Sequence, residues 1–166
     1  RLVYCAISGF GQSGPDAEKP AYDQIIQGLS GVMDVNGDER LHPLRCGFPV
    51  CDTVGGLNAA FAIMGALYHR ERTGEGQFVD LSAVEAMTSL VGDSLFAWSV
   101  TGQVPESDGN FHPEMCPHGA YPCANSEWLS IAIADDGEWQ ALCAVLEADA
   151  MAGDARFASL PARLEN

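Results

Sequence analysis

Asp52 is the residue of this sequence best placed for covalent chemistry. It ends a short apolar run, residues 47–51, and precedes the almost uninterruptedly apolar, small or glycine residues of the segment 53–68. This pattern predicts a strand that leads into a buried helix, with Asp52 at the helix N-terminus. Free backbone N–H groups and the helix dipole favour an ionised carboxylate there, so Asp52 would be a charged, accessible nucleophile. The alternative is an aspartate that only caps the helix, a residue type favoured at that position.

Glycines are expected to leave room for a ligand near this carboxylate. Gly55 and Gly56 follow it in the sequence and would let another molecule approach the helix. A second group, residues 9–14, has the spacing G-x-G-x-x-G of dinucleotide-binding loops after a predicted strand. Residues 15–20 begin and end with proline and cannot open the apolar helix that such a site requires, which argues against a nicotinamide or flavin.

Metal chemistry finds little support in the cysteines and histidines. Four possible ligands lie within a short stretch, namely His112, Cys116, His118 and Cys123. They include neither a C-x-x-C nor an H-x-x-x-H pair, so the spacing matches no closed zinc motif, and we expect no metal site. The six cysteines are scattered through apolar surroundings, which is typical of buried free thiols.

The composition limits the class of protein. Hydrophobic residues make up 47% of the 166 residues, enough to bury the core of one domain or slightly more. Eight basic and 23 acidic residues give a net charge of −15, which argues against nucleic acids and anionic membranes as partners. We expect neither a signal peptide nor an apolar run long enough to span a bilayer. These features predict a cytoplasmic protein.

The elements that must position Asp52 alternate between strand and helix. The expected strands cover residues 2–7 and 77–81, and the expected helices cover residues 22–29, 53–72 and 82–101. The last helix opens with a capping box, in which Ser82 is followed three residues later by Glu85. This succession is typical of an open α/β sheet.

The composition changes after Gly102. Proline, glycine and polar residues dominate residues 105–118, which indicates a linker. Two strands, 120–123 and 128–133, and an amphipathic helix are expected beyond it, whereas no completed helix is expected in the tail. The predicted organisation is therefore an α/β domain that carries Asp52, a linker and an incomplete small α+β domain, at residues 1–104, 105–118 and 119–166.

Several motifs, taken in order, resemble CoA-transferase family III, which includes formyl-CoA and carnitine-CoA transferases and α-methylacyl-CoA racemases. The motifs are Ser8–Gly11 with Gly14–Pro15, Pro20–Asp23, Asp52 with Gly55–Gly56, Arg70–Asp80, and later Gly109–Asn110, His118–Tyr121, Trp128, Trp139 and Arg156–Phe157. The resemblance covers the whole sequence and implies a partial Rossmann-like domain. It implies that Asp52 is the nucleophile, and that substrate or CoA is bound by Gly9, Phe10, Gly11, Asp23, Gly55 and Gly56.

Tyr22 distinguishes two branches of that family. It lies 30 residues before Asp52. At this position the resemblance implies a histidine that moves protons in the racemases and a tyrosine in the transferases. A tyrosine ordinarily has a pKa of about 10 and is a poorer proton acceptor at neutral pH than a histidine, with a pKa of about 6.5. A CoA-transferase acting on an acyl-CoA and a carboxylic acid is therefore favoured. A racemase or epimerase and a non-catalytic binding or assembly module remain the alternatives.

The resemblance also implies a mechanism and partners. Asp52 would attack the thioester and pass through an aspartyl-CoA thioester, with CoA as a substrate and no tightly bound cofactor. Backbone N–H groups at the helix start and in the glycine-rich loop are expected to stabilise the oxyanions, and Tyr22 to position a substrate oxygen. The family's full chain is more than twice as long and its chains interlink. We therefore expect a truncated chain, of doubtful activity alone, that requires missing N- and C-terminal parts or a second copy.

Overall fold

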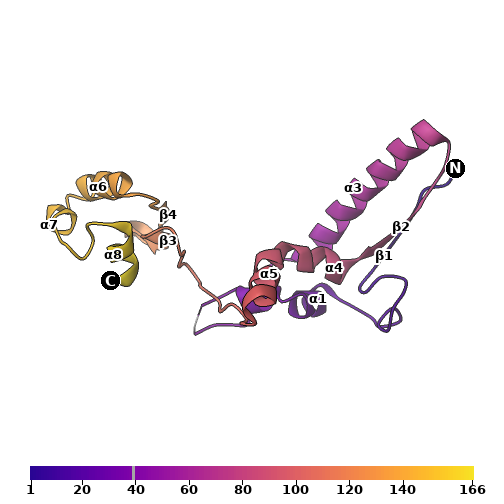
Figure 1. Ribbon diagram of the computed structural model, residues 1–166, viewed down its shortest axis with the longest axis horizontal. Coiled ribbons are helices and arrows are strands. Elements are labelled where there is room, and N and C mark those ends of the chain that lie inside the picture. Colours follow the sequence, from indigo (N-terminus) through magenta and orange to yellow (C-terminus); the bar gives the residue numbers. More distant parts are fainter. Residues whose placement is uncertain (39) are drawn as a thin grey trace. The chain divides into compact units, whose positions relative to one another are not determined.

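The computed structural model describes residues 1–38 and 40–166, which form two compact units (Figure 1). The first unit is Arg1–Ser107 and the second is Asp108–Asn166. The segment expected to be a linker, 105–118, is divided between them. Ser107 is buried in the first unit, where its hydroxyl donates to the Val35 carbonyl at 3.4 Å. In the second unit, the Asn110 carbonyl lies 2.9 Å from Nδ1 of His118.

The first unit is a partial α/β domain. Its elements are β1 (Tyr4–Ser8), α1 (Asp23–Leu29), α2 (Val32–Val35), α3 (Val50–Thr73), β2 (Phe78–Ser82), α4 (Ala83–Thr88), the 3-10 turn η1 (Ser89–Val91) and α5 (Gly92–Thr101). The two strands are parallel neighbours, paired from Tyr4 opposite Phe78 to Ser8 opposite Ser82. Parallel strands need a crossover connection, and α3 supplies its longest part. The α/β class predicted from the sequence is confirmed.

Two element predictions in this unit were wrong. The run before Asp52 is not a strand, because α3 already begins at Val50. The helix expected over 82–101 is divided into α4, η1 and α5. Ser82 does cap α4, accepting the backbone N–H of Glu85 at 3.4 Å, but the helix tightens to a 3-10 turn and resumes at Gly92, a residue type with low helix propensity.

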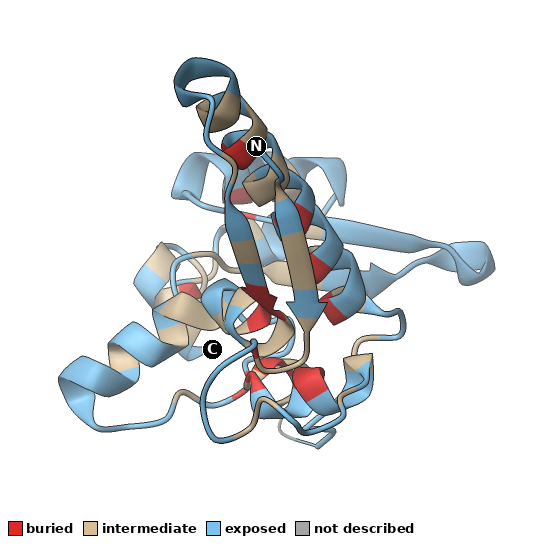
Figure 2. Ribbon diagram, turned by 90° about the vertical axis from the view of Figure 1, so that its right-hand side faces the viewer, coloured by how far each residue is buried: buried red, intermediate tan, exposed pale blue. Residues whose placement is uncertain are grey.

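Small side chains let α3 pack closely against both strands. Its buried residues are Cys51, Gly55, Ala59 and Ala66. Figure 2 shows α3 alongside β1 and β2, with buried positions on the side of the helix that faces them. In the first turn of α3, Cys51 packs with Ile26, Val32 and Met87. This buried cluster links α1, α2, α3 and α4. The backbone that carries Asp52 is therefore anchored in the core of the unit.

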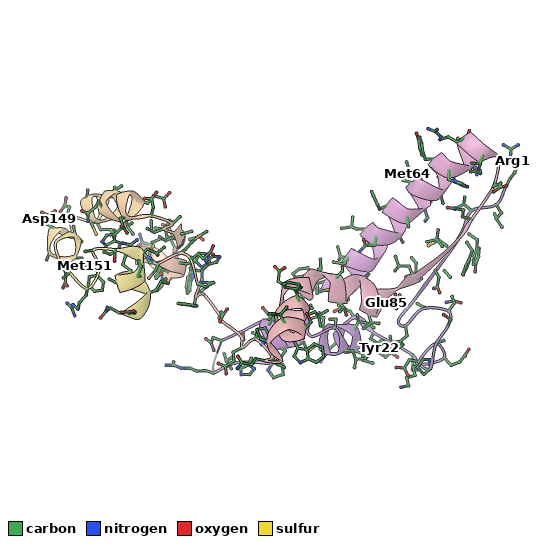
Figure 3. The ribbon with its side chains drawn as sticks, in the orientation of Figure 1. Arg1, Tyr22, Met64, Glu85, Asp149 and Met151 are labelled. Carbon is green, nitrogen blue, oxygen red and sulfur yellow. The ribbon has the colours of Figure 1, made fainter. Side chains whose placement is uncertain are left out.

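The other face of α3 exposes large apolar side chains. They are Leu57, Phe61, Met64 and Tyr68, whose spacing of three and four residues puts them on one side of the helix. Figure 3 shows Met64 projecting away from the two strands. By length and composition alone, α3 could also cross a bilayer, contrary to the expectation that the sequence holds no such run. Core helices of soluble proteins meet the same criterion, so it does not identify a membrane segment.

The second unit combines a hairpin with three helices. Its elements are β3 (His118–Pro122), the 3-10 turn η2 (Ala124–Ser126), β4 (Trp128–Ala132), α6 (Asp136–Val145), α7 (Asp149–Ala152) and α8 (Leu160–Glu165). The strands pair antiparallel, as predicted. The tail does complete a helix, contrary to expectation. The Ser159 hydroxyl caps α8, accepting the Ala162 N–H at 3.4 Å, and Pro161 lies in the first turn, where its missing N–H is harmless.

A buried arginine organises the core of this unit. Ile133, Trp139 and Cys143 form the apolar cluster, and the Arg163 guanidinium lies 5.5 Å from the Trp139 ring centroid. Arg163 donates to the carbonyls of Cys116, Phe157 and Asp135 at 2.9, 3.2 and 3.3 Å. It also pairs with the Asp136 carboxylate at 2.9 Å. These bonds join the segment before β3, the start of α6 and the segment before α8 to α8 itself.

Candidate active site

Asp52 lies in the first turn of α3 as its third helical residue, with an exposed side chain. The residue that precedes the helix is Pro49, whose side chain makes no capping bond. Within residues 1–38 and 40–166, neither a hydrogen bond nor an ion pair engages the Asp52 carboxylate. It is therefore not the capping aspartate that formed the alternative interpretation, and its oxygens are free to react.

The start of α3 is capped by Asp23, from the first turn of α1. One Asp23 oxygen, Oδ1, accepts the backbone N–H of Cys51 at 2.7 Å and that of Asp52 at 3.3 Å. The N–H groups of Val50 and Thr53 donate to the carbonyls of Phe48 and Pro49 at 2.8 and 3.1 Å. The chain itself thus satisfies the donors at this helix start. These N–H groups are already bonded in this structure, so the helix start offers no free donor to an oxyanion, while the same expectation for the glycine-rich loop stays a prediction.

Gln27 holds this cap in place. Its side chain is fully buried, and its Nε2 donates to Asp23 Oδ2 at 2.6 Å and lies 3.4 Å from the Phe48 carbonyl. Its Oε1 accepts the Cys46 N–H at 2.8 Å. Gln27 was not predicted from the sequence. The available signal was its position four residues after Asp23 in a predicted helix, where the two side chains can meet.

A cavity of about 450 Å³ joins Asp52 to Tyr22, although the two are far apart in the sequence. Its lining consists of Ala21, Tyr22, Asp23, Gln24, Arg45, Gly47, Phe48, Pro49 and Asp52. Tyr22 immediately precedes α1 and is 75% exposed, so its hydroxyl is open to a ligand (Figure 3). The structure therefore brings together the two residues predicted to be catalytic.

Arg45 is the one cationic residue among those that line this cavity. Its Nη1 donates to the Cys46 carbonyl at 3.0 Å, which leaves other guanidinium N–H groups for a ligand. Arg45 was not predicted from the sequence. A cation close to the candidate nucleophile, in a chain with 23 acidic residues, was the signal available.

Cys51 adjoins Asp52 but is unsuited to be a nucleophile. Burial, and then the negative charges of Asp23 and Asp52, raise the pKa of its thiol to about 12. The side chain is also only 1% exposed. Because the thiolate is the reactive form of cysteine, Cys51 stays inert at neutral pH and serves the core.

The glycine-rich loop after β1 lies against the chain rather than along this cavity. Gly9 lies so close to Ala21 that a β-carbon would not fit, and Phe10 packs on the buried cluster of the first unit. Gly11 has a φ of 82°, a conformation that favours glycine. No helix opens after Gly14, since the chain forms turns until α1. The CoA-binding roles of Gly9, Phe10 and Gly11 stay predictions.

The glycines that follow the nucleophile differ from each other. Gly55 is buried, and a β-carbon there would lie 3.7 Å from Leu81 of β2. Gly56 is exposed and faces open space. Gly55 thus serves the packing of helix on strand, while Gly56 leaves the approach that was expected. Their roles in binding CoA also stay predictions.

The histidines and cysteines of the second unit serve local structure. The rings of His112 and His118 lie 5.0 Å apart, and the Cys116 thiol is directed at the Arg163 carbonyl at 3.2 Å. In the part of the chain that the structure describes, no three His, Cys, Asp or Glu side chains are arranged to hold a metal ion. A second cavity of about 450 Å³ lies in this unit, but its lining is almost entirely apolar and includes none of the residues predicted to be catalytic or to bind CoA.

The chain belongs to CoA-transferase family III, whose sequence profile matches residues 1–166. It is 36% identical to the succinate–glutarate CoA-transferase of Agrobacterium fabrum over 164 residues, which are 99% of this chain and 41% of the relative. It is 38% identical to the acetyl-CoA:oxalate CoA-transferase of Acetobacter aceti over 167 residues, which are 100% of this chain and 43% of the relative. The chain thus spans about two fifths of these curated relatives.

The fold is shared with solved structures. A CAIB/BAIF family protein from Brucella suis matches with a TM-score of 0.90 and 35% identity, over 99% of this chain and 43% of the other. Rv3272 of Mycobacterium tuberculosis matches with a TM-score of 0.78 at 23% identity, over 99% of this chain and 42% of the other, which shows likeness of fold alone. The chain therefore spans about two fifths of each of these structures.

Proposed function

We propose that the complete protein is a CoA-transferase that moves CoA from an acyl-CoA to a carboxylic acid through an aspartyl-CoA thioester on Asp52. The observation that carries this proposal is the unengaged Asp52 carboxylate at a cavity shared with Tyr22 and Arg45. Membership of the family and the acid-to-acid transfers named for the relatives support it. CoA is then a substrate, and no tightly bound cofactor is required.

In the first half-reaction, an Asp52 oxygen attacks the thioester carbonyl of the donor. The C–S bond breaks and the CoA thiolate departs with the electron pair, which leaves a mixed anhydride. The thiolate then attacks the aspartyl carbonyl and expels the donor acid as a carboxylate. The second half-reaction repeats these steps in reverse order with the acceptor carboxylate and regenerates the Asp52 carboxylate. No proton is consumed, so the cycle needs no general base.

Tyr22 and Arg45 supply the polar side chains that face these reactants in our proposal. The tyrosine hydroxyl donates to a thioester or carboxyl oxygen, and the guanidinium attracts the carboxylate and stabilises developing oxyanions. Arg45 matters because the chain carries a net charge of −15, which repels anionic substrates. Since the N–H groups at the start of α3 are already bonded, side-chain donors take the role first expected of them.

The racemase alternative calls for a histidine that exchanges a proton with the α-carbon of the substrate. The described residues that line the cavity include Tyr22 and no histidine. A racemase would exchange the α-hydrogen of a 2-methylacyl-CoA with solvent deuterium, whereas a transferase would not. The alternative of a non-catalytic binding or assembly module is tested by two measurements, CoA binding in calorimetry and transfer of CoA between acids. A protein that binds CoA but transfers none would support this alternative.

The decisive experiment traps the covalent intermediate. The complete protein is incubated with an acyl-CoA and then with hydroxylamine, and Asp52 is expected to carry the hydroxamate by mass spectrometry. Asp52→Ala should remove the label. Asp93→Asn is the matched control, because Asp93 is likewise exposed in the first turn of a helix, α5, but does not line the cavity. Labelling of another carboxylate, or labelling that survives Asp52→Ala, contradicts the assignment.

Self-association, or coverage by further parts of the protein, is proposed for the exposed face of α3. Leu57, Phe61, Met64 and Tyr68 form an apolar stripe there, and large exposed apolar patches usually mark interaction surfaces. Sedimentation of the complete protein at micromolar concentration tests for the homo-oligomer, and a stable monomer contradicts it. The cytoplasmic location, and the absence of membrane and nucleic-acid partners, stay predictions.

A further inference from the structure

We propose that Asp23, held by Gln27, is a positioning residue that caps α3 in place of Asp52 and so keeps the Asp52 carboxylate free for the reaction. The carboxylates at this helix start then have separate tasks, one structural and one chemical. The inference rests on the proposed function for the role of Asp52, but the geometry of the cap stands independently of it.

The sequence around Asp52 denies its carboxylate a local hydrogen bond. An acidic residue at the third helical position ordinarily reaches back to the N–H of the residue that precedes the helix. Here that residue is Pro49, which has no N–H. The N–H groups of Cys51 and Asp52 itself are taken by Asp23. Pro49 and the bonds to Asp23 thus withdraw N–H donors from the Asp52 carboxylate. Such donors would stabilise the carboxylate and make it a weaker nucleophile.

A separate cap also holds the helix start constant during the reaction. Asp52 loses its negative charge whenever it becomes an anhydride or a thioester, so it could not cap the helix throughout the cycle. Asp23 keeps its charge at the positive end of the helix dipole in every one of these states. The backbone of Asp52 is therefore expected to stay in place while its side chain changes chemically.

Gln27 determines how Asp23 is oriented. Its amide can satisfy both partners in one orientation only, because Oε1 must face the Cys46 N–H and Nε2 must face Asp23. The same side chain thereby fixes the segment that begins with Arg45 and ends at Pro49, along the cavity wall. Tyr22 immediately precedes Asp23 in the chain. One buried amide and one carboxylate thus position Tyr22, Asp52 and the wall between them.

Exchanging the two polar groups tests this arrangement in the complete protein. Asp23→Asn places an amide NH₂ against the NH₂ of Gln27, and Gln27→Glu places two carboxylates together. The double variant restores the pair between these positions with reversed polarity, because the amide now at position 23 donates to the carboxylate now at position 27, which still accepts the Cys46 N–H. The net charge is that of the unaltered protein, and only the 3.4 Å contact of Nε2 with the Phe48 carbonyl is not replaced. We expect each single change to slow acylation of Asp52 at saturating acyl-CoA by about tenfold or more, with a smaller change in KM, as for a misplaced reactive group. The double variant should recover most of that loss.

Ser30→Ala is the control for simple loss of stability. The buried Ser30 hydroxyl donates to the Gln27 carbonyl at 3.2 Å within the last turn of α1 but does not contact Asp23. It should lower the melting temperature and keep the acylation rate of the folded protein. The proposal is overturned if Ser30→Ala slows acylation as much as Asp23→Asn, or if the double variant is no faster than the single ones.

A second measurement separates this inference from the proposed function. Carbodiimide with an amine modifies carboxyl groups without CoA, and the yield at Asp52 is read by mass spectrometry. Asp23→Ala frees the N–H groups of Cys51 and Asp52, to which the Asp52 carboxylate can then bind, so we expect its modification to slow about threefold or more. If the rate is unchanged, the positioning role is wrong. If it slows while acyl-CoA never labels the unaltered protein, the cap stands and the transferase proposal fails.

Discussion

The starts of α3 and α6 both carry aspartates and use them differently. At α6, Asp135 caps its own helix by accepting the Glu138 N–H at 2.8 Å, and Asp136 pairs with the buried Arg163 at 2.9 Å. At α3 the cap comes from Asp23, 28 residues before the Cys51 N–H that it binds, and Asp52 has no partner among the described residues. Both aspartates at the start of α6 are engaged, whereas of the two aspartates at the start of α3, Asp23 is engaged and Asp52 is not.

This difference shows what a free carboxylate requires from its surroundings. A helix start attracts negative charge and offers N–H donors, so an aspartate placed there tends to become part of the cap. α3 avoids this by combining a proline before the helix with an acceptor from another helix. The start of α6 therefore contributes to stability, and the start of α3 leaves Asp52 available for chemistry.

The largest contrast is expected from one substitution made at both sites. Asp52→Asn should lower the transfer rate at least about 1,000-fold, because an amide cannot attack the thioester, and should change the free energy of unfolding by less than about 0.5 kcal/mol. Asp136→Asn should keep the rate and cost about 1 kcal/mol, since its side chain is 57% exposed and its ion pair is screened. Transfer assays and urea unfolding of both variants measure this. Equal loss of rate in the two would remove the distinction.

The features predicted from sequence were those determined by neighbouring residues. β1, β2, α1 and the hairpin were placed within a few residues, because apolar periodicity and turn residues determine them locally. The cap of α4 was visible for the same reason, since Ser82 and Glu85 are three residues apart. Asp52 and Tyr22 were found through the resemblance to the family.

The features that were missed depend on contacts between distant segments. The apolar run before Asp52 is too short to distinguish a strand from a helix start, and the cap from Asp23 together with burial of Cys51 decides for the helix. Gln27 and Arg45 acquire their roles only when α1 meets the segment that precedes α3. The separation of capping and reacting carboxylates could not be deduced from spacing, because it involves helices far apart in the sequence.

The second contrast concerns the cation that engages the start of α6. Arg163→Met should destabilise the second unit by about 3 kcal/mol, because three carbonyl groups lose their buried donor. Arg156→Met is the matched control. Arg156 pairs with Asp154 at 2.7 Å on the surface, and its loss should cost less than about 1 kcal/mol. Hydrogen exchange of amides in the second unit of the complete protein measures both, and similar losses would show that Arg163 contributes no more than a surface pair.

The smallest contrast concerns the cap of α6 itself. Asp135→Ala should lower the free energy of unfolding by about 1 kcal/mol, the usual cost of a lost cap, because the Glu138 N–H is left without its acceptor. Asp135→Asn should recover most of this loss, since an amide oxygen also accepts that bond. Neither change should affect transfer, because Asp135 lies in the second unit and Asp52 in the first. Chemical denaturation monitored at the buried Trp139 measures the effect. If Asp135→Ala left the free energy of unfolding unchanged, water would satisfy the Glu138 N–H. The Asp135 cap would then not be the feature that distinguishes the start of α6 from the start of α3.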